Sequence, residues 1–186
     1  MNRDGKLTNL HLLGVIKLKN DTIHIRDAYP DEVDKVSLLL KTAYQEYESF
    51  ISREAWQTYL QDIMDVSSRV AIAELIVAEL DGRPVGTVTL YLNPSKSSQE
   101  GWPEGWAGIR LLGVDPGYRG RGIGRALMGE CLRRCREQSI RTIGLRTNEI
   151  MDIARRMYER MGFTRVPEFD FHPAPGIVVM AYCLDL

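Results

Sequence analysis

Residues 114–127 read VDPGYRGRGIGRAL, a glycine-rich run between an apolar segment and an amphipathic one. Glycine adopts backbone conformations that other residues avoid, and it lets a ligand approach the main chain closely. From Ile123 to about Gln138, apolar residues recur every three or four positions, which predicts a helix with one buried face. The first N–H groups of a helix have no partner within it. A strand, a glycine-rich turn and a helix in this order therefore predict a phosphate-binding site.

Three arginines surround this turn, at positions Arg119, Arg121 and Arg125. Several positive charges favour a ligand with several phosphates over a ligand with one carboxylate. The alternative is a glycine-rich connection that binds nothing and carries solvated arginines.

Spacing excludes two other phosphate-binding motifs. A dinucleotide fingerprint, G-x-G-x-x-G, counted from Gly120 requires a glycine where Arg125 stands. A P-loop requires Gly-Lys followed by Ser or Thr, and the sequence has no such tripeptide. The pattern that remains is R-x-x-G-x-G at residues 119–124.

The segments on either side of the turn predict the rest of the fold. We expect strands at 22–26, 71–80, 84–92, 106–114, 142–147, 169–171 and 177–184, and further helices from Pro30, from Ser52 and over 149–161. Asp81-Gly82 is a dipeptide typical of a tight hairpin turn. Alternating strands and helices in the middle, with hairpins at both ends, predict a mixed α/β sheet covered by helices.

The composition points to a small-molecule partner. The 186 residues are enough for one buried core. The 24 basic and 25 acidic residues are spread along the chain, so we expect neither a nucleic-acid surface nor a membrane surface. The three cysteines form neither an even disulfide framework nor a metal-binding spacing, so we expect no metal and a reduced, cytoplasmic setting.

Two motifs together resemble a known family. The R-x-x-G-x-G pattern after a strand resembles the signature of GNAT acetyltransferases, and ARRMYERMGF at 154–163 resembles the A-x-x-x-Y-E-x-x-G-F end of a helix in that family. The resemblance implies a GNAT-like α/β fold, in which the central parallel strands of a mixed sheet splay apart between flanking helices. It implies an N-acetyltransferase domain at 20–186, preceded by an N-terminal extension at 1–19.

The resemblance also implies acetyl-CoA as cosubstrate. In the family, backbone amides of the turn hold the pyrophosphate of coenzyme A, and the pantetheine arm pairs with an open strand edge. The corresponding coenzyme-binding residues here are Leu112, Gly113, Val114, Arg119, Gly120, Arg121, Gly122, Ile123, Gly124, Arg125 and Asn148. Gly113 is expected to form a local bulge.

Tyr158 matches the tyrosine that in this family usually protonates the departing thiolate. It also falls on the apolar stripe of its helix, so a structural tyrosine in the core is the alternative. The sequence departs from the family at Met151, where many members have asparagine, and at Gly108, where many have glutamate. Without that glutamate, either Glu104 acts as general base through water or the amine binds already deprotonated.

For the acceptor side we expect Arg110 and Trp102 to bind substrate. The alternative for Arg110, and for Arg146 on the next strand, is an internal ion pair with a carboxylate such as Glu74, because unpaired charge within a sheet is costly. Trp102 is alternatively a packing anchor.

The sequence leaves three functions open. The first is an enzyme that transfers acetyl from acetyl-CoA to a primary amine of a small molecule or a peptide N-terminus, by direct attack in a ternary complex. The second is a non-catalytic acyl-CoA binding or sensing module, and the third is an interaction protein with a purely structural turn. The oligomeric state is open between a monomer and a homodimer.

Overall fold

The computed structural model describes residues 15–17, 22–93, 101–174 and 177–186. The strands are β1 Val15–Lys17, β2 Thr22–Asp27, β3 Glu74–Leu80, β4 Arg83–Tyr91, β5 Trp106–Val114, β6 Thr142–Thr147, β7 Thr164–Arg165, β8 Phe171–Ala174 and β9 Ile177–Asp185. The α-helices are α1 Val33–Tyr44, α2 Arg53–Met64, α3 Val66–Val70, α4 Ile123–Glu137 and α5 Asp152–Arg160. Short 3-10 helices are η1 Pro30–Glu32, η2 Gln45–Phe50, η4 Pro116–Tyr118 and η5 Pro167–Phe169. None of the helices within these ranges is long and apolar enough to cross a membrane.

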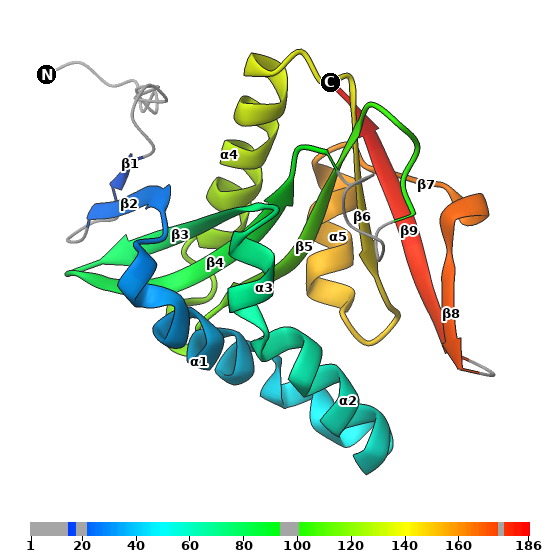
Figure 1. Cartoon of the computed structure of the whole chain (residues 1–186), viewed down its shortest axis with the longest axis horizontal. Coiled ribbons are helices and arrows are strands. Elements are labelled where there is room, and N and C mark those ends of the chain that lie inside the picture. The colour runs from blue at the N-terminus through cyan, green and yellow to red at the C-terminus, as the bar shows by residue number, and fades with distance from the viewer. Residues whose placement is uncertain (1–14, 18–21, 94–100, 175–176) are drawn as a thin grey trace, which may run out of the picture.

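The strands form one mixed sheet in the order β1-β2-β3-β4-β5-β6-β9-β7, with β8 on β9 (Figure 1). The pairing of β5 with β6 is parallel, whereas the other recorded pairs are antiparallel. Because parallel neighbours need a crossover, α4 lies between these two strands in the chain. The mixed, partly parallel sheet predicted from the sequence is confirmed.

β5 and β6 pair over only part of their length. Their pairing runs from Trp106 opposite Thr142 to Ile109 opposite Leu145, while β5 continues to Val114. Figure 1 shows the two strands close together at one end and apart at the other. Among the described residues, the far part of β5 thus has one edge without a strand partner, as the resemblance predicted.

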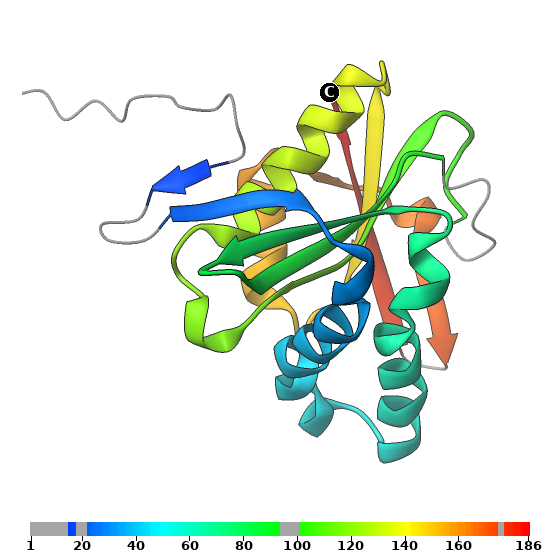
Figure 2. The same cartoon turned by 60° about the vertical axis from the view of Figure 1, so that its left-hand side comes forward.

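Helices cover the sheet on both faces (Figure 2). One buried cluster gathers side chains of α1, α2 and α3 with Leu75, Val77 and Leu111 of the sheet. The other gathers side chains of α4 and α5 on the opposite face. Cys131 and Cys135 lie in this second cluster, as free thiols within the helix stripe predicted from their spacing. The ends of β5 and β6 therefore lie between two layers of helices.

Local signals position several elements as predicted. The Ser52 hydroxyl accepts a hydrogen bond from the Ala55 N–H (3.2 Å) and caps α2. Asp81 and Gly82 both have positive φ, which is the conformation of a type I′ hairpin turn. Pro30 begins a 3-10 turn that runs directly into α1.

Some elements differ from the prediction. Val15–Lys17 forms a strand that pairs with β2 and was not predicted. Residues 1–14 and 18–21 lie outside the described ranges, and the boundary after residue 19 stays a prediction. The segment 167–169 is a 3-10 turn that Pro167 begins, and the strand predicted at 169–171 runs instead from Phe171 to Ala174. α3 and β7 are too short to carry a periodic signal, and neither was predicted.

Candidate active site

The glycine-rich turn has the shape of an anion cradle. Gly120 and Gly122 have φ of 75° and 80°, and Gly122 is the N-cap of α4. Both are exposed, and in the part of the chain that the structure describes a Cβ built on either would meet no heavy atom within 4 Å. Since the first N–H groups of α4 lack intrahelical acceptors, they face this open space as donors for an anion. Gly124 has an ordinary helical φ, so its backbone conformation does not require glycine.

Close packing fixes this turn against the sheet. A Cβ on Gly86 of β4 would lie 2.8 Å from Cγ2 of Ile123, so only glycine lets the first turn of α4 come this near. The Asp115 N–H donates to the Val85 carbonyl (3.0 Å), and the Asp115 carboxylate accepts from the Gly117 N–H (2.8 Å). These contacts set the direction in which the α4 N-terminus points.

The three arginines of the turn are placed differently. The Arg119 guanidinium donates to the Ala43 carbonyl at the end of α1 (2.8 Å) and pairs with Glu46 (2.8 Å). Arg119 therefore fastens the turn to α1, and its contact with a phosphate stays a prediction. Arg121 lies 5.3 Å from the ring centre of Tyr118, and Arg125 is exposed on the first turn of α4.

The bulge in β5 lies at Leu111, and the prediction for Gly113 is wrong. Thr89 is opposite Arg110 and Thr87 is opposite Gly113, so β5 has one more residue than β4 in this stretch. Leu111 takes φ of 52° there. Its side chain is 8% exposed among the residues of α1 and α2, and this burial offsets the cost of the left-handed backbone.

Gly113 has a different role. A Cβ at this position would lie 3.1 Å from Cδ2 of Leu40 and 3.2 Å from Cβ of Ala43. Its absence lets α1 lie close to β5. The Tyr44 hydroxyl then donates to the Leu112 carbonyl (3.2 Å), so α1 is tied to the part of β5 that has left β6.

We call the place where β5 and β6 part, beyond Ile109 and Leu145, the splay. Tyr158 is buried there. Its side chain is 6% exposed, and its ring centre lies 6.0 Å from that of Phe163. Burial raises the pKa of Tyr158 above its ordinary value, and the nearby Tyr47 and Tyr59 raise it further. Among the described residues, none accepts a hydrogen bond from the Tyr158 hydroxyl. The hydroxyl is therefore protonated at neutral pH and is not needed to satisfy a partner in the core.

The end of β6 carries two buried oxygen atoms without hydrogen-bond partners in the described part of the chain, Oγ1 of Thr147 and Oδ1 of Asn148. Buried polar atoms are nearly always hydrogen-bonded, so such a pair calls for an explanation. Both lie where β6 has left β5. A ligand with amide N–H groups, such as the pantetheine arm, fits this arrangement.

Glu104 is not brought to the splay. It is exposed in the turn before β5, at the end where Trp106 pairs with Thr142. Arg110 lies where the strands part, and it is roughly 13 Å from Trp106 along the extended strand. The structure therefore does not place Glu104 beside Tyr158.

The partner expected for Arg110 is also different. Arg110 pairs with Asp62 of α2 (2.7 Å), whereas Glu74 pairs with Arg134 of α4 (2.9 Å). The predicted ion pair of Arg110 is present, but its carboxylate is Asp62 and not Glu74. No local signal in the sequence indicated this partner, because the two residues are 48 positions apart.

Trp102 is a packing residue beside β6. Its ring stacks on Trp106 (5.7 Å between centres) and lies over Gly144, where a Cβ would be 2.7 Å from the indole. Phe169 completes the cluster, 5.7 Å from Trp102. The guanidinium of Arg146 lies 4.2 Å from the centre of the Trp102 ring. The anchor interpretation is thus supported, and substrate contact stays a prediction.

Sequence reasoning missed the tyrosines that α1, η2 and α2 bring to the splay. The Tyr44 ring contacts two others edge to face, with ring centres 5.9 Å from Tyr47 and 6.0 Å from Tyr59. Burial raises the pKa of Tyr47 to about 12 and that of Tyr59 above its ordinary range. Nothing in the sequence indicated that these elements meet Tyr158.

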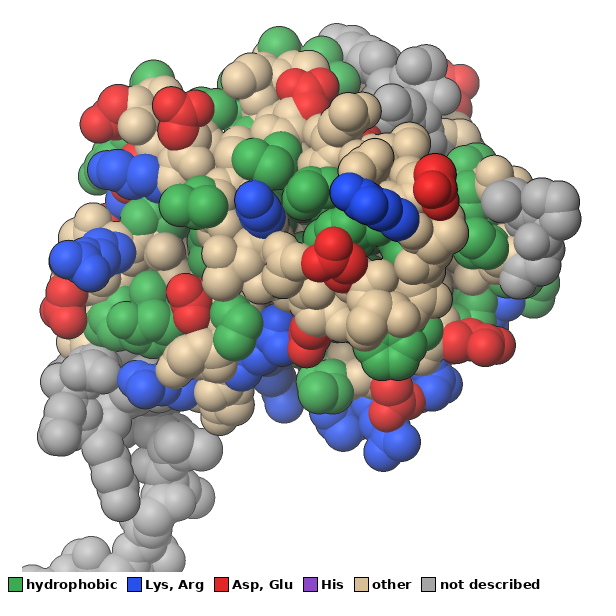
Figure 3. Space-filling view, turned by 90° about the horizontal axis from the view of Figure 1, so that it is seen from below, with side chains coloured by type: hydrophobic (Ala, Val, Ile, Leu, Met, Phe, Trp, Pro, Cys, Tyr) green, Lys and Arg blue, Asp and Glu red, His purple; other side chains and the backbone are tan. Residues whose placement is uncertain are grey.

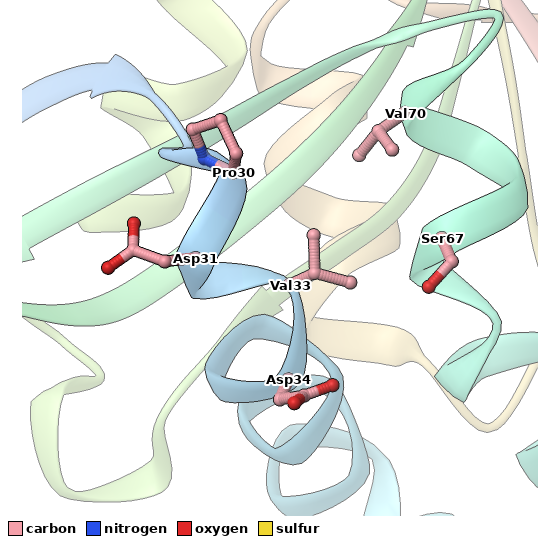
Figure 4. Close-up of a pocket in the computed structure, with 6 residues that line it drawn as sticks. All are labelled: Pro30, Asp31, Val33, Asp34, Ser67 and Val70. Atoms are coloured by element: carbon pink, nitrogen blue, oxygen red, sulfur yellow. The ribbon is translucent and has the colours of Figure 1, made fainter.

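A separate hollow of about 370 Å³ lies at the other end of α1 (Figure 4). Its lining comes from η1, from the start of α1 and from α3: Pro30, Asp31, Val33, Asp34, Ser67 and Val70. The cradle, by contrast, contacts α1 at Ala43. The hollow is therefore not part of the predicted site.

The surface seen from below carries charges of both signs intermixed with apolar side chains (Figure 3). A mixed surface gives no long-range field of one sign.

Comparison with known proteins agrees with this geometry. The profile of the acetyltransferase (GNAT) family matches residues 38–163. Mycothiol acetyltransferase of Cellulomonas flavigena is 36% identical over 94 residues, which are 50% of this chain and 27% of that protein. The mycothiol acetyltransferase of Propionibacterium freudenreichii subsp. shermanii is 29% identical over 143 residues, 77% of this chain and 42% of that protein. The chain thus spans less than half the length of these relatives.

Solved structures show the same fold. PaiA N-acetyltransferase from Thermoplasma acidophilum, in complex with coenzyme A, has a TM-score of 0.71 at 14% identity, over 88% of this chain and 99% of that one. A GNAT family acetyltransferase from Brucella melitensis, in complex with acetyl-CoA, has a TM-score of 0.60 at 23% identity, over 88% of each chain. With its splayed β5 and β6 and the glycine cradle at α4, this chain belongs to the GNAT acetyltransferase family.

Proposed function

We propose that the protein is an acetyl-CoA dependent N-acetyltransferase that acts on a primary amine of a small molecule or a peptide N-terminus. The observation that carries the proposal is the alignment of three features along β5: the cradle at its end, its free edge, and Tyr158 where it parts from β6. Direct attack of the amine in a ternary complex fits this arrangement, because no cysteine lies exposed at the splay to carry the acetyl group.

The residues that would hold acetyl-CoA divide into two groups. The N–H groups of the turn at Gly120–Gly124 would bind phosphate, since they end in a helix N-terminus with open space before it. The side-chain oxygens of Thr147 and Asn148 that lack partners among the described residues would accept hydrogen bonds from amide N–H groups of the pantetheine arm. The unpaired edge of β5 would exchange backbone hydrogen bonds with the same arm. Acetyl-CoA, when bound, supplies the acetyl group as a thioester.

Tyr158 would hold a proton at its hydroxyl beside the thioester sulfur. Its raised pKa keeps that proton bound at neutral pH. The phenol is then a weaker acid than a thiol, whose ordinary pKa is about 8.5, so complete transfer to sulfur is uphill. We assign Tyr158 the donation of a hydrogen bond that stabilises developing negative charge, with net protonation completed from solvent.

The general base is not assigned to Glu104, because the splay lies far along β5 from it. An amine that binds deprotonated needs no base, and this alternative agrees with the glycine at position 108. A metal-free reaction and a cytoplasmic setting remain predictions of the sequence.

A second candidate is an acyl-CoA binding or sensing module. It is favoured by one observation, namely that Gly108 stands where many family members have a glutamate. Binding would be the same for both candidates, and only turnover separates them.

Ligand-specific stabilisation tests the shared part of both candidates. Acetyl-CoA at 100 times its dissociation constant should add ~2.7 kcal/mol to the free energy of unfolding. NAD, which also carries a pyrophosphate, should give no comparable rise in melting temperature. Stabilisation by NAD and not by acetyl-CoA would reject the assignment of the cradle.

A further inference from the structure

One turn of α2 lies along the part of β5 that has left β6. Tyr59 and Asp62 are three positions apart on α2, so their side chains share one face of the helix. Asp62 pairs with Arg110, the first residue of β5 beyond its last recorded row with β6 (2.7 Å from Oδ2 to Nη2). The Tyr59 ring packs on Tyr44 (6.0 Å between centres), whose hydroxyl donates to the Leu112 carbonyl. Both side chains of α2 therefore border the splay.

Several contacts hold Asp62 in place at the end of α2. The guanidinium of Arg69, from α3, donates to the main-chain carbonyls of Asp62 (2.6 Å) and Ile63 (2.7 Å). Arg69 is 4% exposed, so these hydrogen bonds fasten the helix end from within the core. Arg110 holds the carboxylate itself, at Oδ2. Asp62 thus has a fixed position between two arginines.

The Asp62 carboxylate has capacity for further hydrogen bonds. An ionised carboxylate offers about four lone-pair sites on its two oxygens. Among the described residues, Arg110 is the one recorded hydrogen-bond donor to the Asp62 side chain. That side chain is 34% exposed, so a ligand can reach it. Asp62 is therefore an accessible hydrogen-bond acceptor at the splay.

Tyr59 connects this carboxylate with Tyr158. Tyr59 packs among the helices on one face of the sheet, whereas Tyr158 packs in the cluster of α4 and α5 on the other face. Burial raises the pKa of Tyr59, Arg110 lowers it and Asp62 raises it further. Tyr59 in turn raises the pKa of Tyr158. Because such interactions weaken with distance, Tyr59 lies near both groups, and the two faces meet through the opening between the strands.

The Asp62 carboxylate is on the same face of the sheet as residue 108. Gly108 and Arg110 are two positions apart on β5, and Ile109 between them is buried in the cluster that contains α4 residues. Alternate side chains of a strand share a face, so Arg110 reaches Asp62 on the face toward which a side chain at position 108 would point. Asp62 therefore brings a carboxylate to the side of the splay where Gly108 has none.

We propose that Asp62 accepts a hydrogen bond from the acceptor amine and takes the proton that this amine sheds during transfer. The proposal rests on the acetyl transfer proposed above. An amine that binds deprotonated needs no base in order to attack, but its nitrogen becomes positively charged once it has attacked, and it must then lose a proton.

The bonds and charges of this step balance as follows. The amine nitrogen forms a bond to the thioester carbonyl carbon, the carbon–sulfur bond breaks, and its electron pair leaves with the sulfur. The nitrogen gives one proton to the Asp62 carboxylate, and water takes that proton from Asp62. The thiolate receives a proton from solvent, so the products are the amide and free coenzyme A.

The kinetic test compares Asp62→Asn with Glu74→Gln in single turnovers of the acetyl-CoA-loaded protein, using the best acceptor from a panel of amino acids, peptides and aminoglycosides. Glu74 is 37% exposed and pairs with Arg134 (2.9 Å), so each substitution removes one charge from a similar ion pair. We expect the rate to fall by roughly 10² in Asp62→Asn and to stay at the wild-type value in Glu74→Gln. Both variants should keep the rise in melting temperature with acetyl-CoA.

Chemical rescue separates a proton acceptor from a packing residue. Asp62→Ala should be as slow as Asp62→Asn, and added formate, a carboxylate small enough for the vacated space, should restore part of its rate. The wild type and Glu74→Ala should not respond to formate. A wild-type rate in Asp62→Asn, an equal loss in Glu74→Gln, or a loss in Asp62→Ala that formate does not reverse would overturn the role of Asp62 and leave acetyl transfer standing.

Calorimetry of the same amines with the coenzyme A-loaded protein gives a result that needs no turnover. We expect binding of the best amine to weaken by roughly 10-fold in Asp62→Ala, and to be unchanged in Glu74→Ala. Asp62-dependent binding with no turnover of any amine would reject acetyl transfer and keep the amine site. Neither binding nor turnover would reject both.

Discussion

Gly122→Val separates ligand blocking from backbone strain, because the chain supplies a matched control. Gly122 has φ of 80° and Gly105 has φ of 83°, and a Cβ built on either meets no heavy atom of the described residues within 4 Å. Gly105 precedes β5, at the end of that strand opposite to the cradle. The same substitution at the two positions therefore introduces similar strain, and only the change at Gly122 places a side chain in the cradle.

The expected changes in melting temperature follow from the backbone conformation of these two glycines and from ligand binding. A left-handed backbone at a residue other than glycine costs roughly 1–2 kcal/mol, and a β-branched side chain adds to that cost. In a chain of this length, such a loss lowers the melting temperature by roughly 2–8 °C. Acetyl-CoA at 100 times its dissociation constant should raise it by roughly 5–11 °C, from ~2.7 kcal/mol of binding.

The assay is thermal unfolding of both variants with and without acetyl-CoA. We expect Gly105→Val to keep the full ligand-induced rise and Gly122→Val to lose it, although both start from a similar lowered melting temperature. If Gly122→Val keeps a rise equal to that of Gly105→Val, the cradle does not bind the coenzyme and the assignment of residues 120–124 is wrong.

Two other substitutions test Tyr158 and Glu32. Tyr158→Phe should fold normally and bind acetyl-CoA, while its single-turnover rate falls by roughly 10², because the hydrogen bond to the developing charge is lost. A wild-type rate would remove the hydroxyl from the mechanism, and a loss of about 1 kcal/mol in stability would indicate a structural role. Glu32, buried against Arg26, has its pKa lowered from 4.5 chiefly by the hydrogen bond from that arginine. The stabilisation from the Glu32 charge is therefore present above pH 4.5 and is lost as the pH falls through the lowered pKa. Glu32→Gln should cost roughly 1–3 kcal/mol at pH 7 and progressively less below pH 4.5 in denaturant unfolding, and a cost independent of pH would contradict the ion pair.

Sequence patterns with a local physical cause predicted much of the fold. The α4 stripe, the positive φ at Asp81 and Gly82 and the cap at Ser52 each depend on residues close together in the chain. The cradle was predictable for the same reason, because strand, glycines and helix follow one another directly.

Features that depend on distant residues were not predictable in this way. The bulge lies at Leu111 because its side chain finds a buried place among residues of α1 and α2, whereas Gly113 is needed for the approach of α1. The Asp62 partner of Arg110 likewise comes from a helix far away in sequence. A leucine with positive φ and a salt bridge between elements are set by tertiary packing, which overrides local preference.

The central claim is tested most directly by following both products of one reaction. Purified protein is mixed with acetyl-CoA and a panel of amines that includes amino acids, peptides and aminoglycosides, and free thiol and acetylated amine are measured in the same samples. The account predicts that one class of amine releases thiol and gains acetyl in equal amounts, and that both signals vanish when either substrate is omitted. Stabilisation by acetyl-CoA with no acetylated amine anywhere in the panel, or thiol release that does not depend on the amine, would contradict it.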